Sequence, residues 1–254
     1  MISSLARRVH PEVELAELAP TPPVWQRDSS CFHGVGTATG GTGVARLLAV
    51  ANRFNHVIEV VGARGTGHDR AAVIELSGGV AIAVADGAGG TGDGAIAADA
   101  VIEAVRDATE HTSWASLLVD VDRDAKRLKG ALTTAVIANV TSRGISGASV
   151  GDSIAWVIRG TTIEDLSDGQ LRKPLLGDGC IPRKFRSRSL GSATLLVATD
   201  GLWRYASQSA IVRIASRPDL RDAARALIEL VRLPSGALQD DVAVVLCRHE
   251  SGRD

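Results

Sequence analysis

Short apolar segments that adjoin an aspartate recur along this chain, and they constrain its fold more than any other feature. Segments of this length bounded by glycine or polar residues are typical of buried β-strands. The aspartates that adjoin them are Asp86, Asp152, Asp200 and Asp240. An Asp-Gly pair on its own usually marks a turn, whereas a carboxylate at the end of a buried strand is costly unless something neutralises it. Four such carboxylates therefore favour a shared site for Mg²⁺ or Mn²⁺, which prefer oxygen ligands.

The remaining pattern predicts an α+β fold built in layers. Strands are expected over 56–62, 70–76, 80–85, 133–140, 145–150, 154–159, 162–166, 193–199 and 242–247. Most are separated by short turns, which indicates antiparallel pairing. Amphipathic helices are expected over 93–110, 114–128 and 220–231. Two adjacent helices in the middle of the chain and one near its end suit helices stacked on sheet faces.

Composition excludes several classes of protein. Of the 254 residues, 45% are hydrophobic, which is ample for a core, while the net charge is only −1 and aromatic residues make up 3%. Without a basic excess or aromatic platforms we expect no nucleic-acid partner. The apolar runs are too short to span a membrane, and the apolar core of a signal peptide is missing. Three scattered cysteines read as reduced thiols, so we expect a cytoplasmic protein.

The first part of the chain differs from the rest. Residues 1–54 contain four of the eight prolines and a run of small residues rich in glycine over 34–43. Prolines interrupt helices, and glycines raise the entropic cost of ordering a segment. We therefore expect residues 1–54 to form a loosely structured extension and residues 55–250 to form the folded domain.

The segment 84–97, which begins Val-Ala-Asp-Gly, closely resembles the signature of the type 2C metal-dependent (PPM) serine/threonine protein phosphatases. Other segments resemble further motifs of that family: 64–69, 133–135, 150–153, 199–202 and 240–245. Each match is weak alone, but all six follow the family's order. The resemblance implies a four-layer αββα sandwich, in which two antiparallel sheets are flanked by antiparallel helices.

The resemblance also implies a role for individual residues. The metal ligands would be Asp69, Asp86, the carbonyl of Gly87, Asp152, Asp200 and Asp240. Asp86 would bridge two ions, and Asp152 matches the position of a third, weaker ion. Arg64 would clamp the substrate phosphate, a task that suits the planar fork of a guanidinium.

The function that this resemblance implies is hydrolysis of phosphoserine and phosphothreonine in proteins. Two Mn²⁺ or Mg²⁺ ions would share a water and lower its pKa, so that it attacks phosphorus directly. The implied partners are phosphorylated proteins and a cognate serine/threonine kinase system, with no membrane partner. We expect the protein to be a monomer.

Departures from the family pattern keep other interpretations open. The family's Asn-Glu is Gly67-His68 here, and a histidine that some members carry after Asp-Gly is Ala88. These losses allow a phosphatase-like domain that binds phosphoproteins without turnover, or an enzyme acting on a small phosphorylated metabolite. The run 87–92 also fits a GxGxxG dinucleotide fingerprint, but Asp86 would place negative charge beside the pyrophosphate. The basic stretch 183–188 is expected to be a solvated loop.

Overall fold

Two antiparallel sheets form the centre of the fold. The computed structural model describes residues 54–250 except 66, 89–92 and 129. One sheet has the order β1 (Phe54–Val61), β10 (Val242–His249), β9 (Thr194–Ala198), β6 (Ile154–Arg159) and β7 (Thr162–Asp165). The other has the order β2 (Asp69–Leu76), β3 (Gly79–Asp86), β4 (Ala135–Thr141), β5 (Gly144–Val150) and β8 (Arg183–Ser187). The described helices are α1 (Gly94–Arg106), α2 (Trp114–Ala125), α3 (Asp200–Trp203), α4 (Gln208–Ala215) and α5 (Leu220–Leu230).

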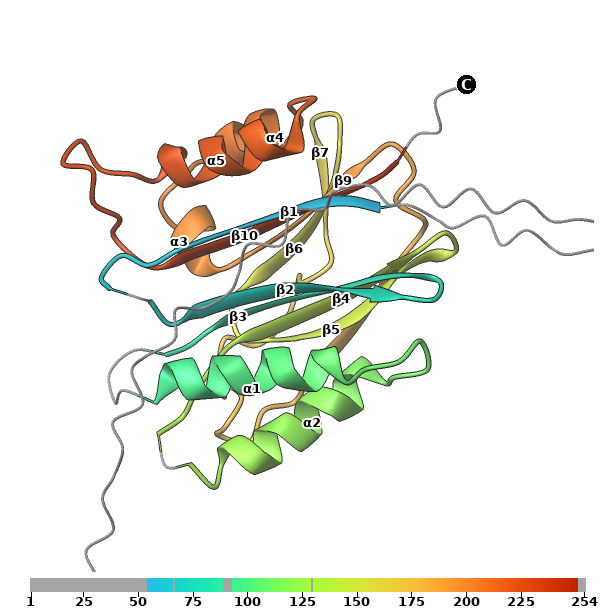
Figure 1. Cartoon of the computed structure of the whole chain (residues 1–254), viewed down its shortest axis with the longest axis vertical. Coiled ribbons are helices and arrows are strands. Elements are labelled where there is room, and N and C mark those ends of the chain that lie inside the picture. Colours follow the sequence, from blue (N-terminus) through green and yellow to red (C-terminus); the bar gives the residue numbers. More distant parts are fainter. Residues whose placement is uncertain (1–53, 66, 89–92, 129, 251–254) are drawn as a thin grey trace, which may run out of the picture. The chain divides into compact units, whose positions relative to one another are not determined.

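The sheets and helices stack in four layers (Figure 1). Helices α1 and α2 cover the outer face of the β2–β8 sheet, and one apolar cluster fills the space between them. Helices α3, α4 and α5 pack on the outer face of the other sheet around a second cluster. A third cluster lies between the two sheets. This confirms the four-layer αββα sandwich implied by the sequence resemblance.

The alternation of side chains in β3 shows why both faces of a central strand are apolar. Val80, Ile82 and Val84 point into the cluster between the sheets. Ala81, Ala83 and Ala85 point the other way, toward α1 and α2. Successive strand residues face opposite sides of a sheet, so a strand covered on both faces needs a continuous apolar run. Alanine on the helical side lets α1 pack closely.

Most predicted elements are confirmed, with small shifts at their ends. The expectation of a basic loop at 183–188 is wrong, because β8 occupies most of it and pairs with β5. Only Phe185 of this strand is buried, so the sequence carries almost no apolar alternation there. Helices α3 and α4 were not predicted. The expected loose extension at 1–54 lies outside the described residues, apart from Phe54, which begins β1.

Within the described residues, no helix is both long enough and apolar enough to cross a membrane.

Candidate metal centre

Strand register places the first two predicted ligands side by side. Strands β2 and β3 are antiparallel, and Asp69 at the start of β2 lies opposite Asp86 at the end of β3. Asp69 is buried, and Asp86 is partly buried. Facing positions of an antiparallel pair bring side chains within a few ångströms. This end of the β2–β3 pair therefore carries two neighbouring carboxylates.

Asp152 and Asp200 reach the same place from other strands. Asp152 follows β5, and Asp200 opens α3 directly after β9. Carboxylate oxygens of Asp86, Asp152 and Asp200 all lie within 4.8 Å of one another. The three predicted ligands therefore converge, although they come from positions far apart in the sequence.

Gly201 allows the α3 turn to approach the loop that carries Asp240. A Cβ atom added to Gly201 would lie 1.9 Å from the carbonyl oxygen of Asp241, so only glycine fits this contact. Strand β10 begins two residues after Asp240 and runs antiparallel to β9. Asp240 lies near enough to the cluster for its charge to help raise the pKa values of Asp86, Asp200 and Asp69.

Burial and mutual repulsion raise the pKa values of these carboxyl groups when no cation is bound. Burial, followed by the charge of Asp86, raises the pKa of Asp69 to about 8. Burial, followed by the charges of Asp200, Asp240 and Asp152, raises the pKa of Asp86 to about 7. The pKa of Asp200 is also raised, again first by burial. A site built of several carboxylates with raised pKa values fits hard divalent cations, which prefer oxygen ligands. Such cations offset both the cost of burying the charges and their mutual repulsion.

Hydroxyl groups hold the backbone around Asp86 in place. The amide of Asp86 donates to Thr134 Oγ1 at 3.0 Å, and Thr133 Oγ1 donates to the carbonyl of Asp86 at 2.8 Å. Thr134 Oγ1 in turn hydrogen-bonds Ser153 Oγ at 2.7 Å, next to Asp152. The sequence resemblance flagged this Thr-Thr pair without giving it a role. The structure shows that it fixes two of the acidic segments relative to each other.

A cleft of about 230 Å³ opens at the acidic cluster. Its lining residues are Asp86, Ala88, Thr134, Asp152, Arg172, Lys173, Leu175 and Arg204. Arg172 Nη2 lies 2.6 Å from Asp152 Oδ2, and Arg204 Nη1 lies 2.7 Å from Asp200 Oδ2. Sequence reasoning missed both arginines. Only the i,i+4 spacing of Asp200 and Arg204 could have signalled one of them.

Two predicted residues are placed less directly. Arg64 is exposed on the loop between β1 and β2 and is not among the residues lining the cleft. Asp241 holds this loop, since it accepts hydrogen bonds from the amides of Ala63 and His68 at 2.7 and 2.5 Å. Gly87 packs against the first turn of α1, where a Cβ would lie 2.5 Å from the carbonyl oxygen of Gly94. The ligand role of Gly87 and the clamp role of Arg64 stay predictions.

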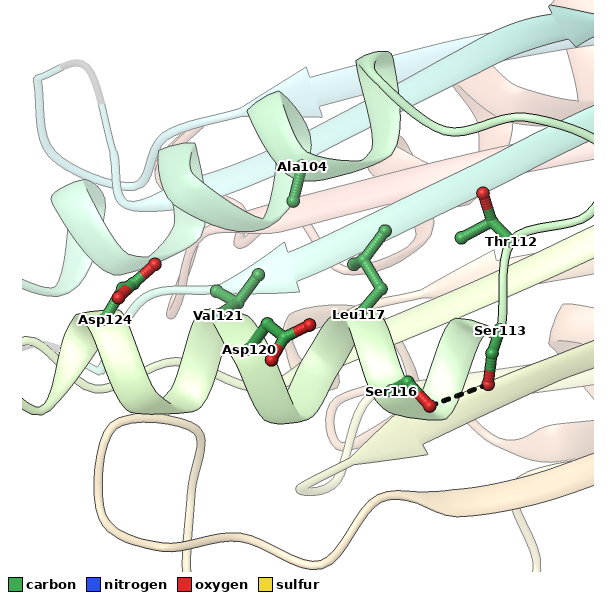
Figure 2. Close-up of a pocket in the computed structure, with 8 residues that line it drawn as sticks. All are labelled: Ala104, Thr112, Ser113, Ser116, Leu117, Asp120, Val121 and Asp124. Carbon is green, nitrogen blue, oxygen red and sulfur yellow. Dashed lines mark hydrogen bonds between the residues drawn. The ribbon is translucent and has the colours of Figure 1, made fainter.

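A larger hollow of about 400 Å³ lies between α1 and α2 (Figure 2). Its acidic groups are paired with arginines of their own helix segment: Asp120 with Arg123 at 2.9 Å and Asp124 with Arg127 at 3.2 Å. Ser113 and Ser116 hydrogen-bond each other at its end (Figure 2). Because its polar groups do not converge on a common point, we place the chemistry in the smaller cleft.

Comparisons with known proteins relate the chain to one family and one fold. The family model described as stage II sporulation protein E (SpoIIE) matches residues 77–250. Among curated proteins, none is significantly similar in sequence.

Solved structures with the same fold include several bacterial phosphatases. A bacterial serine phosphatase is 20% identical, with a TM-score of 0.68 over 80% of this chain and 100% of that one. Stp1 from Staphylococcus aureus is 20% identical, with a TM-score of 0.68 over 83% and 100%. The catalytic domain of PstP, in complex with two manganese ions, is 19% identical, with a TM-score of 0.62 over 76% and 97%.

Proposed function

The chain belongs to the stage II sporulation protein E (SpoIIE) family, and we propose that it is a metal-dependent phosphatase acting on phosphoserine and phosphothreonine of proteins. The observation that carries this proposal is the convergence of Asp86, Asp152 and Asp200 within 4.8 Å at the mouth of a cleft. Support also comes from the fold shared with PstP, whose solved catalytic domain holds two manganese ions.

We propose that Asp69, Asp86, Asp200 and Asp240 hold two cations, Mn²⁺ or Mg²⁺, with the carbonyl of Gly87 as a further ligand. When bound, such ions lower the pKa of a water and offset charge on a phosphoryl group. The Thr133–Thr134 pair keeps Asp86 in place, and Thr199 orients the buried Asp69 through a 2.6 Å hydrogen bond. Arg172 and Arg204 line the cleft, so they supply positive charge for a phosphoryl group that enters it.

The cleft suits a phosphorylated protein better than it suits a small phosphorylated metabolite. The cleft is small and lies at the surface, and Leu171 beside it is largely exposed. A phosphorylated side chain on a flexible segment can enter such a cleft while the rest of its protein stays outside. The source of the phosphate would be a cognate serine/threonine kinase. The expectations of a monomer and of a cytoplasmic location stay predictions.

The direct test is hydrolysis of p-nitrophenyl phosphate and of phosphoserine and phosphothreonine peptides in Mn²⁺. The proposal predicts turnover that EDTA abolishes and that Mn²⁺ restores, with Asp86→Ala inactive. Turnover that persists in excess chelator would contradict the mechanism. If Mn²⁺ raises the Tm but no substrate is hydrolysed, the chain is instead a phosphatase-like binding domain. A preference for free phosphorylated metabolites over peptides would contradict the proposed substrate class.

A further inference from the structure

Asp152 has a cationic partner within the chain. Arg172 donates two hydrogen bonds to Asp152 Oδ2, one from Nη2 at 2.6 Å and one from Nε at 3.1 Å. Asp152 is the residue that the sequence resemblance links to a third, weaker ion. The guanidinium therefore places a positive charge beside Asp152, and it carries that charge at any physiological pH.

The backbone around Arg172 is anchored on both sides, which fixes the place of this side chain. Before it, Gln170 Nε2 donates to the carbonyl of Ser153 at 2.7 Å. After it, Leu176 exchanges backbone hydrogen bonds with Thr133, next to Asp86. Beyond that, Asp122 of α2 accepts hydrogen bonds from the amides of Gly177 and Gly179 at 2.8 and 3.0 Å. Arg172 is thus presented over the cleft by a short segment tied to both neighbouring loops.

Arg204 differs from Arg172 in its partner. It pairs with Asp200, a proposed ligand of the first ion, so a cation bound there would compete with this ion pair. Arg172 pairs with Asp152, which is not among the four carboxylates proposed to hold the two ions. A guanidinium has five N–H donors, and two of those of Arg172 are used on Asp152. Its remaining donors have no hydrogen-bond partner among the described residues, so we infer that they contact phosphate oxygens.

We propose that Arg172, held against Asp152 at the mouth of the cleft, takes the place of a third metal ion and binds the substrate phosphate. This inference rests on the proposed phosphatase function and assigns Arg172 to binding of the substrate phosphate. It predicts that the wild-type protein binds two divalent cations, because Asp152 is already neutralised. It also predicts that loss of the guanidinium weakens phosphate binding.

The first test is the stoichiometry of Mn²⁺ binding, measured by calorimetry on chelator-stripped protein. We expect two ions in the wild type and a third, weaker ion in Arg172→Ala, because that substitution frees Asp152. Arg172→Lys keeps the charge and should keep two ions. Arg186→Ala removes an exposed arginine of β8 and serves as the matched control. We expect this variant to bind two ions, as the wild type does. Three ions in the wild type, or two in Arg172→Ala, would overturn the proposal.

The second test is the affinity of inorganic phosphate, measured by the same method at a Mn²⁺ concentration that fills the two stronger sites and leaves the third, weaker site of Arg172→Ala empty. We expect Arg172→Ala to weaken phosphate binding about tenfold or more, as for the loss of a charged hydrogen bond. Arg172→Lys should recover part of the loss, and Arg186→Ala should keep the full wild-type affinity. An affinity for Arg172→Ala within about twofold of wild type would overturn the proposal.

Both readouts are binding measurements, so they separate this inference from the proposed activity. A protein that shows the expected ion count and phosphate affinities but no turnover would contradict the proposed function and leave the role of Arg172 standing. The side chain of Arg172 is 60% exposed, so its removal should cost little stability. A Tm of Arg172→Ala close to that of the wild type would confirm that the binding changes do not come from unfolding.

Discussion

The hydroxyl of Thr199 donates a 2.6 Å hydrogen bond to Oδ2 of Asp69. The hydroxyl oxygen of Thr199 also accepts a 2.8 Å hydrogen bond from the amide of Ala243 in β10. Thr199 directly follows β9 of one sheet, whereas Asp69 begins β2 in the other. A single buried hydroxyl thus ties the two sheets together at the edge where the acidic side chains meet.

Removing this hydroxyl should destabilise the protein. Thr199→Val keeps the shape of the side chain but leaves the carboxylate of Asp69 and the amide of Ala243 without this partner. We expect a loss of about 1–3 kcal/mol in the free energy of unfolding, measured by urea denaturation. Thr199→Ser retains the hydroxyl and should lose less. Equal stability of the two variants would show that the hydrogen bonds contribute nothing.

Neutralising Asp86 should separate stability from activity. In metal-free protein at pH 8, above the raised pKa of Asp86, Asp86→Asn removes a charge that burial and the repulsion of Asp200, Asp240 and Asp152 disfavour, so we expect a higher Tm than that of the wild type. The same variant should lose at least about a thousandfold in kcat and should no longer gain Tm from Mn²⁺. Asp120→Asn on α2 is the control and should match the wild type in both respects. A metal-free Asp86→Asn less stable than the wild type would argue against the repulsion.

The stability of the metal-free protein should fall as the pH rises. In the folded state Asp69 and Asp86 hold their protons up to about pH 8 and 7, whereas their ordinary pKa is 3.8. Between these limits the folded state binds more protons than the unfolded state. The contribution of these two groups to stability is therefore fully present below about pH 4 and is lost by about pH 8. In EDTA we expect a Tm several degrees higher at pH 5 than at pH 8.

Manganese should reverse this trend, because protons compete with the cation for the same carboxylates. The rise in Tm on adding Mn²⁺ should therefore be larger at pH 8 than at pH 5. A Tm in EDTA that increases over this range would mean that the acidic cluster is not protonated in the folded protein.

The glycine contact between α3 and the Asp240 loop should be sensitive to a single methyl group. Gly201→Ala places a Cβ 1.9 Å from the carbonyl oxygen of Asp241, so the loop must move. We expect a cost of about 1–3 kcal/mol in unfolding free energy, together with weaker binding of Mn²⁺. Gly78→Ala is the matched control, since nothing lies within 4 Å of its Cβ position. Similar urea midpoints for the two variants would show that the contact tolerates a side chain.

The sequence predicted the parts of the fold that depend on local apolar pattern. The run 80–85 became β3, and 242–247 became most of β10, because both strands are covered on two faces and leave a continuous apolar signal. Strand β8 left no such signal, since backbone pairing with β5 stabilises it and only Phe185 is buried. The local apolar pattern of a sequence does not reveal a strand that is stabilised mainly by backbone pairing with its neighbour.

The acidic part of the site was predictable because each aspartate adjoins a strand end or a glycine turn. The basic part was not. Arg172 lies in an irregular segment whose place over the cleft depends on Gln170, Thr133 and Asp122, which are distant in sequence from the groups they bind. Such a placement follows only from tertiary contacts. Arg64 was predicted as a phosphate clamp from a matching motif, and since it is not among the residues that line the cleft, that role stays a prediction.

The central claim is that Asp86, Asp200 and Asp240 hold a pair of cations. Crystals soaked in Mn²⁺ and measured for anomalous scattering at the manganese edge test it most directly. We predict two peaks at the acidic cluster, both within coordination distance of Asp86, and their loss in Asp86→Ala. An anomalous map with no peak at Asp86, from crystals in millimolar Mn²⁺, would contradict the account.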